Sequence, residues 1–131
     1  MFNSIADAIK VAQDQSLTEL EREKALRYLE MSDDPEAIKT LISVLEDDDH
    51  GVRFAAAEVL SAQGESSFKY LLESLTQPNN VMLREGARMV IHQNSSVTVK
   101  AKSKELSNAF DAPEADICTM EEATKLLIEW K

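Results

Sequence analysis

Residues 49–60 read DHGVRFAAAEVL, and the pattern of this stretch occurs three times at one fixed spacing. Each copy lies 31 positions from the next and carries the same four residue types: a helix-capping oxygen, an arginine, an alanine and a large aliphatic residue. The copies are Thr18, Arg22, Ala25 and Leu29, then Asp49, Arg53, Ala56 and Leu60, and finally Asn80, Arg84, Ala87 and Ile91. Self-similarity at one period is the signature of a repeat architecture. The sequence therefore predicts a stack of repeats.

A second apolar pattern alternates with the first. Apolar residues recur at i, i+3, i+4 and i+7 in three segments, which begin at Ile5, Ile38 and Phe68. This spacing gives one apolar stripe along a helix. Each repeat is therefore predicted to be a helix pair, an A helix followed by a B helix, at about residues 4–31, 35–63 and 65–93. One pair cannot bury its own stripe, so the pairs are expected to stack.

Residues at the expected helix ends agree with these pairs. Thr18, Asp49 and Asn80 each precede a B helix and can accept a hydrogen bond from its first N–H groups. Thr18 with Glu21 also makes a capping box. Gly64 is expected to close the second B helix with a left-handed backbone.

Gly86 lies inside the third B helix, where glycine costs about 1 kcal/mol relative to alanine. The residue at the matching place in the second repeat is the small Ala55. A small residue at this position is expected to allow a close approach of a neighbouring helix.

Residues 96–131 depart from the repeat and are predicted to form a divergent fourth helix pair that caps the C-terminal end. The first helix is expected within residues 96–110 and a loop within 111–117. Thr119 and Glu122 resemble a second capping box that opens the last helix. Terminal units of stacked repeats are usually atypical, because they must shield the end of the core. Residues 1–131 are thus expected to form one domain.

Composition supports an all-α chain and argues against several partners. Aromatic residues make up only 5% of the 131 residues, and glycine and proline are few, which favours helices over sheets. There are 24 acidic and 14 basic residues, giving a net charge of −10. Such a surface repels phosphate backbones and anionic lipid, so neither nucleic acid nor a membrane is an expected partner. A basic protein partner remains compatible with this charge.

The chain shows no sign of secretion or membrane insertion in its sequence. Cys118 is the only cysteine, so no internal disulfide is possible. The first ten residues lack the basic and apolar regions of a signal peptide. No apolar run approaches the length of a transmembrane helix. The sequence therefore predicts a cytoplasmic protein.

An A helix, a short acidic turn and the pattern D-x-x-V-R-x-x-A-x-x-x-L resemble the HEAT-like repeat, particularly the short bacterial version found in phycobilisome lyase subunits. The best match is Asp49, Val52, Arg53, Ala56 and Leu60. The resemblance covers about residues 4–93, and the first copy departs from it at Glu21, where an aliphatic residue is expected. It implies a right-handed α-α superhelix in which the B helices line the concave side.

The three arginines of the repeat are interpreted as part of a structural ladder between repeats. An arginine at each boundary can pair with the Asp or Asn cap of its neighbour and with turn carbonyls, which suit the planar guanidinium. The alternative, an anion-binding ladder, is less favoured. The residues assigned to this ladder are Arg22, Asp49, Arg53, Asn80 and Arg84.

No catalytic, cofactor or metal site is expected. The sequence holds no P-loop, G-x-G-x-x-G, H-E-x-x-H or G-x-S-x-G motif. His50 and His92 are far apart and belong to no Cys/His cluster. In the acidic turn, Gly51 is fifth from Asp47, whereas an EF-hand loop needs glycine at its sixth place. Cys118 is interpreted as a small, partly buried side chain rather than a reactive thiol.

The face of the B helices that is not used for packing is predicted to form a binding groove. Non-repeating residues on this face are the candidates for function, with Phe54 and Met89 the most notable because other copies are polar there. A contact of Phe54 with an A helix is an equally supported alternative. The same helical wheel also directs Glu23, Glu30 and Ser61 toward the groove. The assigned groove residues are Arg27, Phe54, Glu58, Glu85, Met89 and His92.

These features predict a non-enzymatic scaffold or adaptor that binds another protein in a rigid groove. The resemblance implies one alternative, a bilin-lyase-like subunit or pigment-protein chaperone. A nucleic-acid-binding HEAT-like protein is a further alternative, disfavoured by the acidic charge. Self-association through incompletely capped ends is also open.

Overall fold

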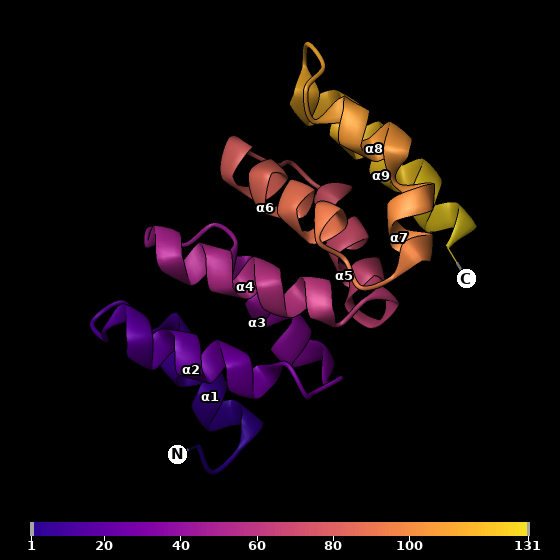
Figure 1. Cartoon of the computed structure of the whole chain (residues 1–131). Helices are drawn as coiled ribbons and strands as arrows, with labels where there is room; N and C mark the ends of the chain where they lie inside the picture. The colour runs from indigo at the N-terminus through magenta and orange to yellow at the C-terminus, as the bar shows by residue number, and fades with distance from the viewer. Residues whose placement is uncertain (1, 131) are drawn as a thin grey trace.

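The computed structural model describes residues 2–130, which form nine α-helices and contain no β-strand (Figure 1). The helices are α1 (Ile5–Gln13), α2 (Glu19–Leu29), α3 (Pro35–Val44), α4 (His50–Ala62), α5 (Glu65–Leu75), α6 (Val81–His92), α7 (Val97–Lys102), α8 (Lys104–Ala109) and α9 (Ala115–Glu129). The predicted all-α class is confirmed.

The first six helices stack as three A–B pairs in two layers. The B helices α2, α4 and α6 pack side by side in the layer that faces the viewer in Figure 1, and the A helices α1, α3 and α5 pack behind them. Within the pairs, α1 packs on α2 and α3 on α4. This arrangement is an α-α solenoid, as the two alternating apolar patterns predict.

The repeated small and aliphatic residues make the core between the layers. Ala25, Ala56 and Ala87 are fully buried, as are Leu29 and Leu60. Alanine at the middle of each B helix lets neighbouring backbones approach, while each buried leucine contributes about 1.5–3 kcal/mol relative to an exposed one. The 31-residue repeat therefore places one small and one large residue at each boundary.

The helix starts of the B layer follow the sequence. Thr18 Oγ1 accepts the N–H of Glu21 at 3.2 Å, and Glu21 Oε2 accepts the N–H of Thr18 at 3.2 Å, which completes the capping box. Asp49 Oδ1 and Asn80 Oδ1 accept N–H groups three residues later, at 3.1 and 2.9 Å. These caps satisfy N–H groups that have no partner inside the helix.

The two notable glycines have different roles. Gly64 joins α4 to α5 with φ +63° and ψ −131°, so the positive φ is found but the expected left-handed helical ψ is not. Gly86 lies inside α6 against the buried Leu45, where an added Cβ would come within 3.1 Å of the leucine side chain. The close approach expected at Gly86 is therefore present, and it brings α6 against the end of the second A helix.

The C-terminal segment differs from the predicted helix pair, because it forms three helices. The expected helix within residues 96–110 is broken at Ser103 into α7 and α8. The last helix begins at Ala115, so the second capping box was wrong. Thr119 is fully buried inside α9, and its Oγ1 has no hydrogen-bond partner. Because the apolar face of α9 packs against its neighbours, the helix begins before the residue that the local capping pattern marks as its start.

α9 caps the A layer. It packs on α5 and on α8, and so takes the place that a fourth A helix would occupy. Trp130, directly after α9, packs against the buried Phe68 with ring centroids 5.2 Å apart, and Lys102 Nζ lies 5.5 Å from the indole centroid. Trp130, the one tryptophan of the sequence, thus docks on the third repeat and shields the end of its core.

Candidate functional site

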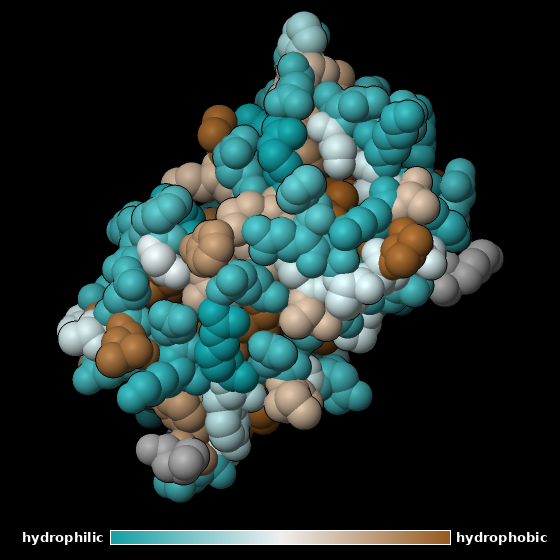
Figure 2. All heavy atoms as spheres, in the orientation of Figure 1, coloured by the Kyte–Doolittle hydropathy of each residue, from teal (hydrophilic) through white to brown (hydrophobic). Residues whose placement is uncertain are grey.

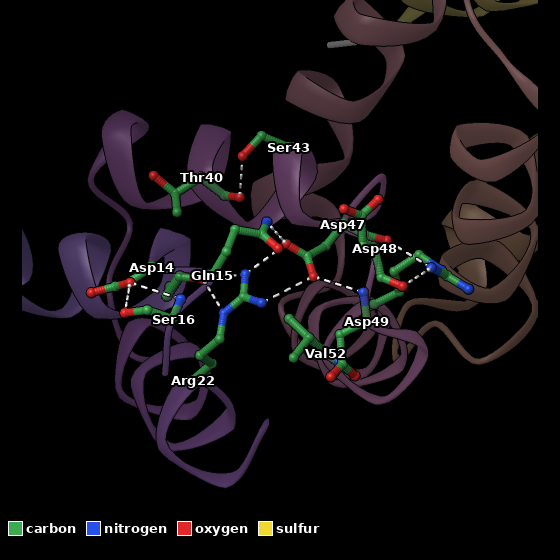
Figure 3. Close-up of polar contacts among 12 residues, drawn as sticks. Asp14, Gln15, Ser16, Arg22, Thr40, Ser43, Asp47, Asp48, Asp49 and Val52 are labelled. Atoms are coloured by element: carbon green, nitrogen blue, oxygen red, sulfur yellow. Dashed lines mark hydrogen bonds and ion pairs between the residues drawn. The ribbon is translucent and has the colours of Figure 1, made fainter. Parts of the chain in front are cut away.

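A buried ion pair closes the boundary between the first two repeats (Figure 3). Arg22 is only 2% exposed. Its Nε and Nη2 donate to the carbonyl of Ala12 at 3.0 and 2.8 Å. Its Nη1 and Nη2 donate to the two carboxylate oxygens of Asp47 at 3.0 and 2.6 Å. One guanidinium therefore joins the end of α1, helix α2 and the α3–α4 turn.

The acid that Arg22 binds is Asp47, which corrects the prediction that the arginine pairs with the cap Asp49. Asp47 accepts the backbone N–H of Asp49 at 2.9 Å and the side-chain amide of Gln15 at 2.8 Å. Burial raises the pKa of Asp47, but the hydrogen bonds from Arg22, Asp49 and Gln15 outweigh it and hold the pKa below its usual value. Asp49 keeps its oxygen for the helix cap instead.

The other two repeat arginines bind their own turns and reach no carboxylate. Arg53 Nη1 donates to the carbonyls of Asp47 and Asp48 at 2.6 and 3.2 Å. Arg84 Nη1 donates to Asn79, at 2.6 Å to the side-chain oxygen and 3.4 Å to the carbonyl. Within residues 2–130 neither arginine forms an ion pair.

Pro78 explains why the ion pair of the first boundary is not repeated. It lies 31 positions after Asp47, at the same place in the next A–B turn. A proline offers no acceptor side chain, so Arg53 has no equivalent acid in the third repeat. Its guanidinium remains at the surface between α4 and α6.

A hollow of about 310 Å³ opens between α4 and α6. Three of the predicted groove residues, Phe54, Glu85 and Met89, line it together. Phe54 is 42% exposed and Val81, at the start of α6, is 64% exposed. The full lining is Leu45, His50, Arg53, Phe54, Val81, Met82, Glu85, Gly86, Arg88 and Met89. Figure 2 shows apolar surface over α4 and α6 bordered by hydrophilic side chains. We call this hollow the α4–α6 groove.

His92 belongs to an adjoining hollow rather than to the α4–α6 groove itself. That second hollow lies between α6 and α8 and is lined by Met89, Arg88, His92 and Ser107, among others. Arg88 forms the ridge between the two, and it is held there by Asp111 at 2.7 Å and by the ring of Phe110. The predicted site residues on α6 therefore serve two neighbouring concavities.

Arg27 and Glu58 lie on the same B-helix face but bind each other. Arg27 Nη2 donates to Glu58 Oε1 at 2.6 Å across α2 and α4, with both side chains about two-fifths exposed. The hydrogen bond that Arg27 donates to Glu58 raises the pKa of Arg27. These two residues therefore bridge the first boundary and lie outside the α4–α6 groove.

Ser61 does not face the groove, which corrects that part of the helical-wheel reasoning. It is 3% exposed, and its hydroxyl donates to the carbonyl of Ala57 at 2.7 Å. The hydroxyl also lies 3.5 Å from the carbonyl of Val90 in the next B helix. The end of α4 is covered by α6, so this position is used for packing.

Several groove residues were missed by the sequence reasoning, including Arg53, Val81, Met82 and Arg88. Arg53 was assigned only to the structural ladder. Its lack of an acid partner follows from Pro78, and the 31-residue alignment of Asp47 with Pro78 was a signal that could have revealed it. Val81 and Met82 lie in the first turn of α6, before the aliphatic positions of the repeat, and no periodic pattern marks them.

Outside the α4–α6 groove, a larger hollow of about 680 Å³ lies beside α1 and α2 and is lined by Phe2, Val11, Leu17, Glu21, Lys24, Arg27 and Tyr28. Within residues 2–130, no group of three or more His, Cys, Asp or Glu side chains is arranged to hold a metal ion. No helix in this part of the chain is long and apolar enough to cross a membrane. Cys118 is partly exposed, and its Sγ lies 3.6 Å from the carbonyl of Pro113.

Stacked helix pairs with a groove between B helices define an α-solenoid. The family model for HEAT repeats matches residues 5–92, about two thirds of the chain, and the protein belongs to this family. The match covers α1 through α6, which are the three pairs found in the structure. Neither the curated proteins nor the solved structures gave a match. The family is typically non-catalytic, and HEAT repeats are commonly scaffolds for protein interaction.

Proposed function

We propose that this protein is a non-enzymatic scaffold or adaptor and that it holds a segment of a partner protein in the α4–α6 groove. The observation that carries this proposal is the exposed apolar lining of that groove. Phe54 and Val81 are 42% and 64% exposed beside Met82 and Met89. Aromatic residues and methionine are enriched at protein interfaces, and anchors of this kind dominate binding energy.

The groove is suited to binding because its walls are already fixed. Leu45 beneath it is fully buried, and Gly86 holds α6 close to that leucine. Arg88 is held by Asp111 and by Phe110 at the edge of the groove. A pre-formed surface loses little conformational entropy on association, so a larger share of the contact energy appears as affinity.

The proposal is tested by affinity capture from lysate of the source cells, comparing the wild type with Phe54→Ala/Met89→Ala. We expect a specific protein to be enriched by the wild type and reduced at least about tenfold with the double variant, since two interface anchors are lost. The matched control is Leu20→Ala/Met31→Ala, which removes two exposed apolar side chains, 61% and 90% exposed, outside the groove.

Equal enrichment with the groove variant and the wild type would contradict the proposal. Loss of enrichment with both double variants would point to non-specific apolar capture and contradict it as well. Circular dichroism and thermal unfolding of each variant show that the scaffold is intact. The control variant removes exposed side chains and is expected to change stability by less than about 0.5 kcal/mol. Met89 is partly buried against the core, so the groove variant is expected to lose more, within the roughly 0.5–3 kcal/mol of most point substitutions.

Two finer hypotheses from the sequence remain predictions with direct tests. A bilin-lyase-like role, implied by the resemblance, predicts an absorbance shift when a bilin is added to the protein. Nucleic-acid binding is opposed by the net charge of −10 and predicts a salt-sensitive gel shift. We propose that both experiments give a null result and that the partner is a protein.

A further inference from the structure

Arg53 has an unused hydrogen-bonding edge at the groove, in contrast to the arginine one repeat before it. Arg22 uses Nε, Nη1 and Nη2, all of them for strong acceptors. Arg53 uses Nη1 for two turn carbonyls, while Nη2 contacts only His50 Nδ1 at 3.3 Å. Within residues 2–130, Nε of Arg53 donates no hydrogen bond. A guanidinium edge of Nε and Nη2 matches a carboxylate in a bidentate pair.

The position of Arg53 makes this edge relevant to the groove. Arg53 is half-buried and lines the same hollow as Phe54 and Met82, so its charge stands beside apolar surface. The other cation on the lining, Arg88, is already bound to Asp111. Arg53 is therefore the cation of this groove that has no carboxylate partner within the described part of the chain.

Building on the proposed function, we propose that the groove binds a peptide segment carrying one Asp or Glu beside a large apolar side chain. The carboxylate pairs with Nε and Nη2 of Arg53, and the apolar side chain enters the hollow against Phe54. An engineered apolar cavity of about 150 Å³ holds benzene, so the 310 Å³ of this groove accommodates a side chain of phenylalanine or leucine size.

A single carboxylate fits the charges of this region better than the other occupants. A phosphorylated or strongly acidic segment would be repelled by the overall charge of −10. A basic segment would meet Arg53 on the lining of the groove, and a cation next to a half-buried cation is unfavourable. A segment with a single carboxylate between apolar side chains forms the ion pair with Arg53 and adds only one negative charge, so the added repulsion is small.

The test is a selection of short randomised peptides displayed on phage against the folded full chain. We expect the enriched peptides to share an Asp or Glu close to Leu, Ile, Phe or Met. Individual synthetic peptides are then measured by isothermal titration calorimetry. Phe54→Ala is expected to weaken binding about tenfold through loss of an apolar anchor. Arg53→Gln is expected to weaken it about tenfold through loss of a charge-assisted hydrogen bond.

Arg84→Gln is the matched control. Arg84 holds the same repeat position and also donates to its own turn, but it does not line the groove. Its substitution is expected to change binding less than about twofold, within the range of substitutions away from an interface. A second measurement avoids variants of the protein: replacing the peptide Asp by Asn is expected to weaken binding to the wild type about tenfold, and to have little effect on Arg53→Gln.

The possible failures separate the two proposals. Three results would overturn the carboxylate inference and leave the proposed groove intact, provided that binding still depends on Phe54. The enriched peptides could carry no acidic residue, they could carry Lys or Arg instead, or they could bind Arg53→Gln as well as the wild type. Self-association of the chain that is lost in Phe54→Ala places a second copy in the groove and overturns the carboxylate inference as well. Enriched peptides that bind Phe54→Ala unchanged contradict the proposed function itself.

Discussion

The two boundaries between B helices, α2–α4 and α4–α6, have the same backbone plan but different surfaces. At the first, Arg22 and Asp47 form a buried ion pair, and Arg27 and Glu58 form a second pair at the surface. At the second, within residues 2–130, no ion pair joins the two helices, and a hollow of about 310 Å³ lies between them. One boundary is closed by charge, and the other is open and lined by apolar side chains.

The 31-residue register shows how few substitutions produce this difference. Arg27, Glu58 and Met89 hold the same repeat position. The charged pair Arg27–Glu58 at the first boundary therefore corresponds to Glu58 and the uncharged Met89 at the second. Asp47 aligns with Pro78, so Arg53 loses the acid that Arg22 has. A repeat scaffold can thus gain a binding groove at one boundary by changing side chains while the helix stacking is kept.

The largest effect is expected from breaking the closed boundary with Arg22→Met. This change leaves the carboxylate of Asp47 buried without its cation, which typically costs roughly 3–5 kcal/mol. We expect a free-energy loss of that size in urea unfolding followed by circular dichroism. The control Arg84→Met removes a half-exposed arginine with no carboxylate partner and is expected to cost less than about 1.5 kcal/mol.

The pH dependence provides an internal check on Arg22→Met. In the wild type the folded-state pKa of Asp47 is lowered, so its stabilising contribution is present above the usual pKa and is lost as the pH falls through the folded-state value. The difference in stability between wild type and variant is therefore expected to shrink on acidification. A difference that stays constant with pH would show that the loss comes from packing and not from the ion pair.

A smaller effect is expected at Gly86, where α6 packs against Leu45 at the end of α3. Gly86→Val adds side-chain atoms where even a Cβ would lie 3.1 Å from the buried Leu45. Overpacking of this kind typically costs 1–3 kcal/mol, so we expect a loss of about 2 kcal/mol in thermal or urea unfolding. An unchanged or raised stability would mean that α6 can move away from Leu45 without cost.

Gly51→Ala is the matched control from the first boundary. The three atoms nearest to a Cβ at Gly51, all closer than 3.0 Å, belong to the carboxylate end of Glu19, a flexible and exposed side chain that can turn away. Replacing glycine by alanine in a helix gains up to about 1 kcal/mol. We therefore expect opposite signs for the two glycines, which would show that close packing of α6 is particular to the boundary that carries the groove.

Much of the fold follows from the sequence because local and tertiary signals coincide in the repeats. The period of 31 residues, the Thr18 capping box and the Asp49 and Asn80 caps all identify helices that the structure contains. In the C-terminal segment the signals conflict. Thr119 carries a local capping pattern, but burial of the same residue against neighbouring helices extends α9 to Ala115. Tertiary packing therefore determines the residue at which α9 begins.

The candidate site was predictable where it depends on repeat position and not where it depends on contacts. Phe54 and Met89 were identifiable because they interrupt a polar pattern. The pairing of Arg27 with Glu58 was overlooked, although opposite charges at one repeat position mark it. The free edge of Arg53 depends on which atoms of its guanidinium meet turn carbonyls, and no sequence pattern specifies that choice.

The smallest effect is expected at Glu19, whose carboxylate lies beside Asp49 at the first boundary. A hydrogen bond with the carboxyl of Asp49, and repulsion from its charge, raise the pKa of Glu19. The folded state therefore binds this proton more tightly than the unfolded state, so the interaction opposes folding once the pH rises above the folded-state pKa. Glu19→Gln is expected to stabilise the protein slightly near neutral pH, with the gain disappearing in acid. The control Glu36→Gln changes another exposed first-turn glutamate, in α3, and removes the same favourable interaction with a helix N-terminus. If the stability of both variants changes alike across the pH range, repulsion between Glu19 and Asp49 does not destabilise the folded protein.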